Sequence, residues 1–358
     1  MPTIWSAISG HGYGHAAQVI PVLNQLAKHV PNLKSILRTT VPASFFQDRL
    51  NIPWDLQPVE QDIGCIQKGP LQIDVPATWE RHIKLHREWE QRVMIESTAM
   101  KAACPQVILA DTPYLAVSAG CEAGIPAVVI ANFTWNEILE PFAEPGDPRH
   151  GAILADISRS YGQADLALRA EPGLAMPSFS KVLDIGPLAE PAVSCREELR
   201  RHLGLSTSDR LVLVAFGGIP LLSLPWLKMS AMQGFHFIVD DVPGKFVPRI
   251  HSKASLPFSF KTLLASVDTV MTKPGYGTIV EAVNLGLSVV YVRRFNFADE
   301  PPLITYLQRY GRGYELSLDD FLSGRWEYAL DAINDQTSPL VPTPSGAADA
   351  ANHLRRYF

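Results

Sequence analysis

Short apolar runs alternate with longer stretches of helical periodicity through the first part of the chain. The apolar runs have the length of buried strands and cover residues 4–9, 33–39, 106–110 and 127–131. Apolar positions at helical spacing cover residues 16–29, 76–103 and 115–123. Within the long stretch 76–103, the possible core positions are Ile83, Val93, Met94 and Met100. Strands that alternate with helices in this way predict a parallel α/β sheet.

The same alternation begins again after a segment rich in proline and glycine at 183–193, which is typical of a linker. Strands are predicted here over 211–216, 235–239, 267–271 and 287–292, and a last helix over 347–357. A chain of 358 residues is long enough for two domains. We therefore expect an N-terminal domain over 1–188, a C-terminal domain over 189–340, and a helix in 341–358 that crosses back to the first domain. Two open α/β domains that face each other place a ligand in the cleft between them, at the carboxyl ends of the strands.

The segment from Met271 to Ala282 carries the clearest chemical signal. A strand, a turn at 274–277 and a helix predicted to start at Thr278 follow one another. Free backbone N–H groups and the helix dipole make such a helix start an anion site. Glu281, predicted in the first helical turn, is placed to accept hydrogen bonds from ribose hydroxyls, so the segment suggests a nucleotide diphosphate. A capping box from Thr278 to Glu281 would explain the same residues without a ligand.

A second glycine turn, from Gly10 to His15, follows the first predicted strand. Its glycines allow a ligand to approach the backbone closely. The pattern differs from the GxGxxG of dinucleotide sites, and residues 38–40, at the end of the next strand, include no carboxylate for a ribose. His15, at the start of the following helix, is a candidate to accept a proton from a substrate hydroxyl. The alternative is a histidine that hydrogen-bonds to its own turn.

Two further strand ends lie at the same predicted edge of the sheet. Asp111 ends a buried strand, where it can orient His15 and stabilise its protonated form. The alternative for Asp111 is an N-cap of the helix from Pro113 onward. The loop from Asn132 to Trp135 has a polar and aromatic mixture suited to an acceptor, although aromatic packing in the core is the commoner role.

Two loops of the second half complete the set of candidates. Gly217 and Gly218 follow its first strand, and their bare N–H groups suit a diphosphate, although a tight turn without a ligand is equally compatible. In 293–300, arginines can pair with phosphate, and Asp299 and Glu300 can accept hydrogen bonds from sugar hydroxyls. A solvated loop of mixed charge is the alternative for this segment.

Composition and charge disfavour several classes of protein. The net charge of −5 and the isoelectric point near 6.1 argue against nucleic acid as a partner. Four scattered cysteines without a CxxC pair argue against a zinc site or a disulfide framework. His82 and His86 are four residues apart, a spacing that metal sites use, but no third ligand accompanies them. We therefore expect both histidines on a solvated face of the helix. No apolar run reaches the ~20 residues of a membrane span, and no basic leader precedes the first strand, so we expect a cytoplasmic protein. Peripheral membrane contact stays open for 221–227, although core packing is favoured there.

Together these motifs resemble a known family of transferases. The chain resembles the donor-site motif of two-domain GT-B glycosyltransferases at residues 272–275, 277–278 and 281–282. Within that class, the nearest group is that of the MurG-type enzymes and monogalactosyldiacylglycerol synthases. The run 9–16, with 131–135, is closer still to the glycosyltransferase-like N-terminal region of plant L-arabinokinases. The resemblance implies an α/β protein of the GT-B class, with two Rossmann-like doubly wound domains that face a central cleft.

The resemblance also implies a function: inverting transfer of a sugar from a UDP-linked donor to the hydroxyl of a small-molecule, lipid or protein acceptor, without a cofactor or metal. His15, assisted by Asp111, would be the base. The donor side would comprise Gly217, Gly218, Lys273, Gly275, Tyr276, Gly277, Thr278, Glu281 on the ribose, and Asp299 and Glu300 on the sugar. The acceptor side would comprise His11, Gly12, Gly14, Asn132 and Trp135. Two alternatives stay open: a nucleotide-sugar epimerase or hydrolase on the same fold, and a non-catalytic nucleotide-sugar-binding protein.

Overall fold

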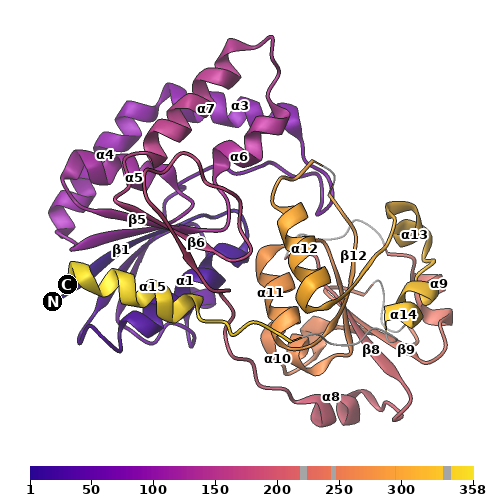
Figure 1. Ribbon diagram of the computed structural model, residues 1–358. Helices are drawn as coiled ribbons and strands as arrows, with labels where there is room; N and C mark the ends of the chain where they lie inside the picture. Colours follow the sequence, from indigo (N-terminus) through magenta and orange to yellow (C-terminus); the bar gives the residue numbers. More distant parts are fainter. Residues whose placement is uncertain (218–223, 243–246, 295, 334–339) are drawn as a thin grey trace.

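The computed structural model describes residues 1–217, 224–242, 247–294, 296–333 and 340–358. It contains two parallel sheets with helices packed on both faces of each (Figure 1). The prediction of a parallel α/β protein is therefore confirmed. Strands covered on both faces read as continuous apolar runs, which is why their positions are visible in the sequence. We call the first sheet with its helices the N-terminal half, and the second sheet with its helices the C-terminal half.

The first sheet has seven strands in the order β3-β2-β1-β4-β5-β6-β7. They are β1 (Thr3–Ile8), β2 (Lys34–Arg38), β3 (Trp54–Gln57), β4 (Val107–Asp111), β5 (Ala127–Ala131), β6 (Leu166–Ala170) and β7 (Val182–Ile185). All neighbours are parallel, so Ile4 of β1 lies between Ser35 and Val107. Three of these strands gave no clear sequence signal, because β3 and β7 are partly exposed edge strands and Arg169 interrupts the apolar run of β6.

The helices of the N-terminal half include a break that the prediction lacks. They are α1 (Tyr13–Leu26), α2 (Ala43–Phe46), α3 (Val75–Arg87), α4 (Trp89–Ala103), α5 (Tyr114–Ala123), α6 (Trp135–Leu139) and α7 (Pro148–Tyr161). The predicted single helix over 76–103 is wrong, because the chain leaves helical geometry at Glu88, with ψ 9°. After this break Trp89 stacks on His86, with ring centroids 5.3 Å apart. Met94, a predicted core position, is 62% exposed on α4.

His82 also departs from its prediction. It is buried rather than solvated, and its Nε2 lies 2.9 Å from the carbonyl oxygen of Gly64. Burial lowers the pKa of His82 to about 4. His82 therefore packs against the loop after β3, whereas His86 Nε2 lies 3.1 Å from the Tyr114 hydroxyl oxygen of α5.

The second sheet has six parallel strands in the order β10-β9-β8-β11-β12-β13. They are β8 (Arg210–Val214), β9 (Phe235–Val239), β10 (Ile250–Ser252), β11 (Thr269–Thr272), β12 (Ser288–Tyr291) and β13 (Arg312–Glu315). The helices are α8 (Arg196–Leu203), α9 (Trp226–Ala231), α10 (Phe260–Ser266), α11 (Tyr276–Asn284), α12 (Glu300–Tyr310), α13 (Leu318–Ser323) and α14 (Glu327–Ala332). Successive residues of β8, such as Leu211 and Val212, point to opposite faces of the sheet, where they belong to two different apolar clusters.

The last helix, α15 (Gly346–Leu354), packs against α1 and β7 of the N-terminal half (Figure 1). The chain comes very close to itself at this point. The Gly346 N–H donates to the carbonyl oxygen of Pro187 (3.2 Å), and a Cβ on Gly346 would lie 2.1 Å from the carbonyl oxygen of Gly186. Only glycine fits there, which explains the residue at the start of the helix.

Apolar side chains of each half pack into a hydrophobic cluster of the other half at their junction. Phe297 of the C-terminal half is buried in a cluster of the N-terminal half, and Ala298 packs against the same cluster. In the opposite direction, Leu71 packs against a cluster of the C-terminal half. A third cluster runs through both halves. Burial of apolar surface, at ~25 cal/mol per Å², makes such contacts stabilise the junction between the halves.

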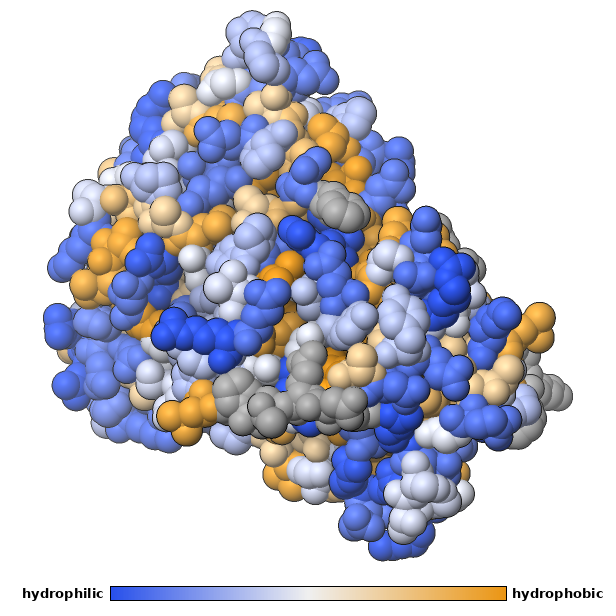
Figure 2. Space-filling model, turned by 45° about the vertical axis from the view of Figure 1, so that its right-hand side comes forward, coloured by the Kyte–Doolittle hydropathy of each residue, from blue (hydrophilic) through white to orange (hydrophobic). Residues whose placement is uncertain are grey.

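Hydrophobic and hydrophilic residues are mixed over the face of the molecule in Figure 2. Leu227, in the segment for which membrane contact was considered, is 87% exposed. Within the described part of the chain, no helix is both long and apolar enough to cross a membrane.

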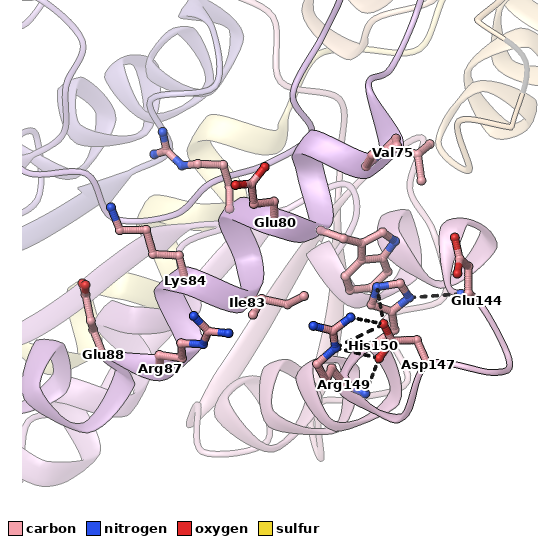
Figure 3. A pocket seen from close by; sticks show the side chains of 13 residues that line it. Val75, Glu80, Ile83, Lys84, Arg87, Glu88, Glu144, Asp147, Arg149 and His150 are labelled. Carbon is pink, nitrogen blue, oxygen red and sulfur yellow. Dashed lines mark hydrogen bonds and ion pairs between the residues drawn. The ribbon is translucent and has the colours of Figure 1, made fainter.

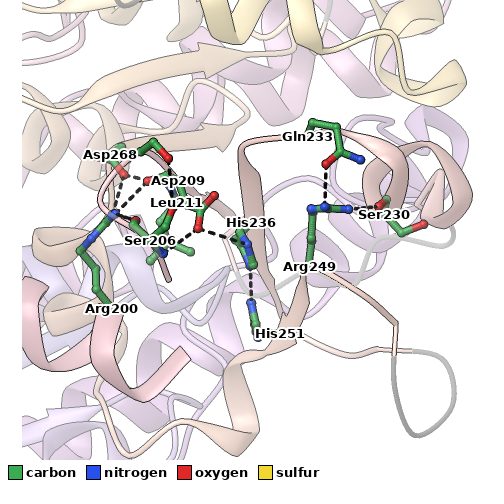
Figure 4. A network of polar contacts seen from close by, with 11 residues as sticks. Arg200, Ser206, Asp209, Leu211, Ser230, Gln233, His236, Arg249, His251 and Asp268 are labelled. Carbon is green, nitrogen blue, oxygen red and sulfur yellow. Dashed lines mark hydrogen bonds and ion pairs between the residues drawn. The ribbon is translucent and has the colours of Figure 1, made fainter. Parts of the chain in front are cut away.

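A pair of histidines lies at the edge of the second sheet (Figure 4). His236 Nδ1 and His251 Nε2 are 3.1 Å apart, and the rings stack at 11°. Burial lowers the pKa of His251 to about 4, and the neighbouring His236 and His202 add to the effect. The pair therefore favours the neutral state of His251 in the folded protein.

Acidification should destabilise the protein through this pair. The unfolded chain binds a proton at His251 near pH 6.5, whereas the folded protein does so only near pH 4, so stability falls as the pH falls through this window. When the pH is lowered from about 7 to about 5, we expect the stability of His251→Gln to fall less than that of the wild type. The midpoint of urea unfolding at each pH measures the stability. The exposed His29, replaced by Gln, is the control. An equal loss in His251→Gln and the wild type would contradict the prediction.

Candidate functional site

Both predicted glycine sites lie where the strand order reverses. In the first sheet the chain proceeds outward from β1 through β2 and β3, then crosses to β4 on the other side of β1. In the second sheet, β8 and β11 form the same kind of reversal. At such a point α/β proteins bind ligands, because the connections after the two strands diverge to opposite faces. The loops 9–12 and 112–113 lie at the first reversal, and 215–217 and 273–275 at the second.

His15 and Asp111 come together at the first reversal. α1 begins three residues before its predicted start, so His15 lies in its first turn. The His15 Nδ1 atom is 3.1 Å from Asp111 Oδ1, and both residues are buried. Asp111 does not cap α5, whose N-cap residue is Pro113 without a side-chain bond, so the capping alternative is wrong. The turn before α1 requires Gly12, because its φ of 96° strains any other residue.

The electrostatics of this pair suit a base. Burial by itself lowers the pKa of His15, but Asp111, with help from Asp62 and Asp299, raises it above the ordinary value. When Nδ1–H donates to the carboxylate, the lone pair is on Nε2. The arrangement is that of a general base with its orienting acid.

Asp62 is a second buried carboxylate at this site, and sequence reasoning missed it. It accepts hydrogen bonds from Ser9 Oγ (2.8 Å) and Trp135 Nε1 (2.7 Å). Burial raises its pKa, while the charge of His15 and these two donors oppose the increase. The one sequence signal was an acid two residues before Gly64 in the loop after β3. Because β3 itself was not predicted, that loop had no assigned place.

The residues predicted for the acceptor side gather around the same turn. His11 packs edge-on against Trp135, with ring centroids 5.6 Å apart, and its Nε2 lies 3.0 Å from Gln67 Nε2. Burial lowers the pKa of His11 to about 3, so the ring is neutral. Asn132 is buried, and Trp135 is fully enclosed as its core-packing alternative predicts. Gly14, in contrast, faces open space.

At the second reversal, α11 begins two residues earlier than predicted, at Tyr276, with Gly275 as its N-cap. Glu281 lies in the second turn, so the predicted capping box between Thr278 and Glu281 is wrong. Among the described residues, no side chain caps this end. The N–H groups of the first turn, including Gly277 and Thr278, are left for another partner. The helix start therefore keeps the properties of an anion site.

Lys273 lies directly before this helix start. It extends toward Gly217, where an added Cβ would lie 3.6 Å from Lys273 Cε. Burial lowers the pKa of Lys273 to about 7; Arg294 adds to the effect and Asp299 opposes it. An ammonium group in such surroundings gains stability from a bound anion. Gly218, the other glycine predicted here, lies outside the described residues.

Two predicted donor residues have protein partners. The Tyr276 hydroxyl donates to the carbonyl oxygen of Glu171 (2.9 Å) and accepts from the Leu188 N–H (3.0 Å). Its side chain thus fastens α11 to the connection between β6 and β7 and to the segment between the two sheets, and only its backbone can serve a ligand. Glu281 lies 3.6 Å from Lys261 Nζ. Burial raises the pKa of Glu281, and Lys261 opposes the increase.

Arg294, Asp299 and Glu300 are buried, so their interpretation as a solvated loop is wrong. Arg294 Nε donates to Glu300 Oε1 (2.7 Å), and the Arg294 backbone N–H is 3.1 Å from both carboxylate oxygens. Asp299 has a longer contact, 3.4 Å from Arg294 Nη2. Burial raises the pKa of Asp299 to about 6, against the effect of Arg294. The Glu300 carboxylate is therefore engaged by the arginine, and Asp299 has the freer oxygen atoms.

The two sites act on each other across the junction of the halves. The charge of Asp299 raises the pKa of His15, and that of Lys273 helps to lower the pKa of His11. The His15–Asp111 pair on the N-terminal half and the residues near the start of α11 on the C-terminal half thus share one electrostatic environment. Within the described ranges, no three His, Cys, Asp or Glu side chains gather to hold a metal ion.

A separate groove of about 870 Å³ lies between α3 and the start of α7 (Figure 3). Trp79 and His150 are among its lining residues and stack on each other, with ring centroids 3.9 Å apart. Charged side chains from both helices line it. None of the sequence-predicted site residues is among its lining residues.

Comparison with curated proteins shows one relative, which is longer than this chain and is matched over part of its length. L-arabinokinase of Arabidopsis thaliana is 26% identical over 332 residues, which cover 90% of this chain and 31% of the relative. The chain thus spans about a third of that protein's length. No protein-family model matches the chain.

Solved glycosyltransferase structures resemble the whole chain. The glycosyltransferase of kitacinnamycin has a TM-score of 0.64 at 16% identity, and the calicheamicin glycosyltransferase CalG4 has 0.62 at 15%. Medicago truncatula UGT71G1 complexed with UDP-glucose has 0.64 at 12%. Each comparison covers 99% of this chain and 94% of the other. The chain therefore has the α/β GT-B fold, with two doubly wound parallel sheets.

Proposed function

We propose that this protein is an inverting glycosyltransferase, which moves a sugar from a UDP-linked donor to an acceptor hydroxyl. One observation carries the proposal: a buried histidine–aspartate pair shares its surroundings with an uncapped helix start that has a buried lysine beside it. The structural similarity to a UDP-glucose complex supports the donor class. The sequence similarity to L-arabinokinase supports a sugar-handling site, and the finer resemblance to MurG-type enzymes stays a prediction.

In the proposed reaction, His15 Nε2 accepts the proton of the acceptor hydroxyl while its oxygen attacks the anomeric carbon of the donor sugar. The bond from that carbon to the diphosphate breaks on the opposite face, which inverts the configuration. The electron pair leaves with the diphosphate, where the Lys273 ammonium and the N–H groups at the start of α11 stabilise the charge. Asp111 orients the imidazole and stabilises the imidazolium that forms. The protein thus supplies positive charge at the leaving group, and the proposed step needs no metal ion.

The remaining predicted residues have graded roles in this proposal. Glu281 accepts hydrogen bonds from the ribose, and Asp299 accepts them from the donor sugar. Glu300 acts indirectly, through its bonds to Arg294. We assign the base to a domain over 1–188 and the donor to a domain over 189–340, with 341–358 returning to the first.

UDP binding tests the donor site through Lys273 and Glu281. We expect UDP at about 100 times its Kd to stabilise the wild type by about 2.7 kcal/mol. Lys273→Met should weaken UDP binding by ~10–100-fold, because a hydrogen bond to a charged group contributes about 1.5–3 kcal/mol. Glu281→Ala should weaken UDP binding and leave pyrophosphate binding unchanged, because its partner is the ribose. Isothermal titration calorimetry measures these affinities.

Lys28→Met, at an exposed lysine after α1, is the matched control and should bind UDP normally. A thermal-shift panel of UDP-, GDP-, TDP- and ADP-sugars then identifies the donor. If the protein binds none of these four nucleotide sugars, the proposal is contradicted. Consumption of the donor by water alone would indicate a hydrolase, an isomerised sugar an epimerase, and binding without consumption a non-catalytic protein.

A further inference from the structure

Asp62 is a buried carboxylate that the proposed reaction leaves without a role. It is 5% exposed. Its Oδ1 accepts from Ser9 Oγ (2.8 Å), and its Oδ2 accepts from Trp135 Nε1 (2.7 Å) and, at 3.4 Å, from Thr112 Oγ1. Burial raises the pKa of Asp62, whereas the charge of His15 and the donors from Trp135 and Ser9 act in the opposite direction and stabilise the ionised form. The local structure therefore accommodates a carboxylate here.

The three donors come from three different strand ends. Ser9 follows β1, Thr112 follows Asp111 at the end of β4, and Trp135 opens α6 after β5. Thr112 has a φ of 67°, a left-handed conformation that is costly for a β-branched residue. Asp62 thus links the loops that surround His15, and one of its bonds reaches the strained residue next to Asp111.

The charged neighbours of His15 make this second carboxylate consequential. Asp111 contacts the ring directly, and Asp62 and Asp299 act on it from a greater distance. His11 is a neighbouring histidine that could oppose this effect if it were protonated. Burial keeps it neutral, because it lowers the pKa of His11 to about 3. Proton transfer converts the His15 imidazole to an imidazolium, so each nearby anion stabilises the state that forms.

We propose that Asp62 is a positioning residue for His15: it ties together the three loops around the imidazole and adds a second negative charge to its surroundings. Its role differs from that of Asp111, which bonds to the ring and sets its orientation. Asp62 acts through the loops and through its charge. Only the kinetic part of the test below rests on the proposed function.

Asp62→Asn separates the charge from the shape, because asparagine keeps the volume and one acceptor oxygen. In protein labelled with ¹⁵N at histidine, we expect the proton affinity of His15 to fall about tenfold, which moves its titration down by about one pH unit. In turnover of a UDP-sugar, the acid limb of the kcat/KM profile should move to lower pH by the same amount, with the donor KM unchanged. Ser9→Ala is the matched control: it removes one bond to Asp62 but keeps the charge, so the His15 titration should stay in place.

An unchanged His15 titration in folded Asp62→Asn would overturn the proposal. An equal shift in Ser9→Ala, which keeps the Asp62 carboxylate, would also overturn it, because the shift would then not come from the negative charge of Asp62. If Asp62→Asn does not fold, the wild type carries the test: the ¹³C carboxyl signal of Asp62 must inflect where His15 titrates, and a flat signal refutes the coupling. A shifted titration in a protein that consumes no nucleotide sugar contradicts the proposed function and supports this inference.

Discussion

Replacement of His15 by alanine should lower turnover of a nucleotide sugar by about 10²–10⁴-fold, the usual contribution of a positioned general base. The affinity for UDP should stay unchanged, because the proposed diphosphate contacts lie at the start of α11 and at Lys273, on the C-terminal half. UDP release, measured with saturating donor and a panel of acceptors, gives the turnover. Calorimetric titration with UDP gives the affinity.

The exposed His29, replaced by alanine, serves as the control for the loss of a histidine. Asp111→Asn should also lower turnover, because an amide cannot stabilise the imidazolium as a carboxylate does. Normal turnover in His15→Ala would remove this residue as the base. Loss of both turnover and UDP binding would instead indicate collapse of the junction between the halves.

Removal of the Glu300 carboxylate should lower the free energy of unfolding by about 3–5 kcal/mol, because it leaves the buried Arg294 guanidinium without its main partner. Both oxygens of Glu300 lie 3.1 Å from the Arg294 backbone N–H, and Oε1 also accepts from Nε at 2.7 Å. Arg294 further stacks over Phe297, which is buried in the cluster of the opposite half. The loss should therefore reach the junction as well. Urea unfolding of Glu300→Ala measures it.

An exposed ion pair provides the comparison. Glu60 and Arg81 are 2.8 Å apart at the surface, and Glu60→Ala should cost less than about 1 kcal/mol. Equal effects of the two substitutions would show that burial does not set the energy of the Arg294 pair.

Local patterns were enough to predict the central strands and the two glycine turns. Residues 127–131 and 235–239 are strands with the predicted bounds, because burial on both faces makes an apolar run continuous. The starts of α1 and α11 were placed two or three residues late. Neither helix has a side-chain cap, so the residue types that mark a helix start are missing there.

The sequence by itself therefore determined two parallel α/β halves, each with a glycine turn at a strand end. It also supplied His15 and Asp111 as candidates, since their residue types suit the chemistry, and Lys273 through the resemblance to a known donor-site motif. The pairing of His15 with Asp111, 96 positions away, was a prediction from the shared strand edge, but only the tertiary structure gave its contact of 3.1 Å and added Asp62, from a loop that had no assigned place. The physical reason is that pairing and pKa depend on burial and on neighbours distant in sequence, which local periodicity does not encode.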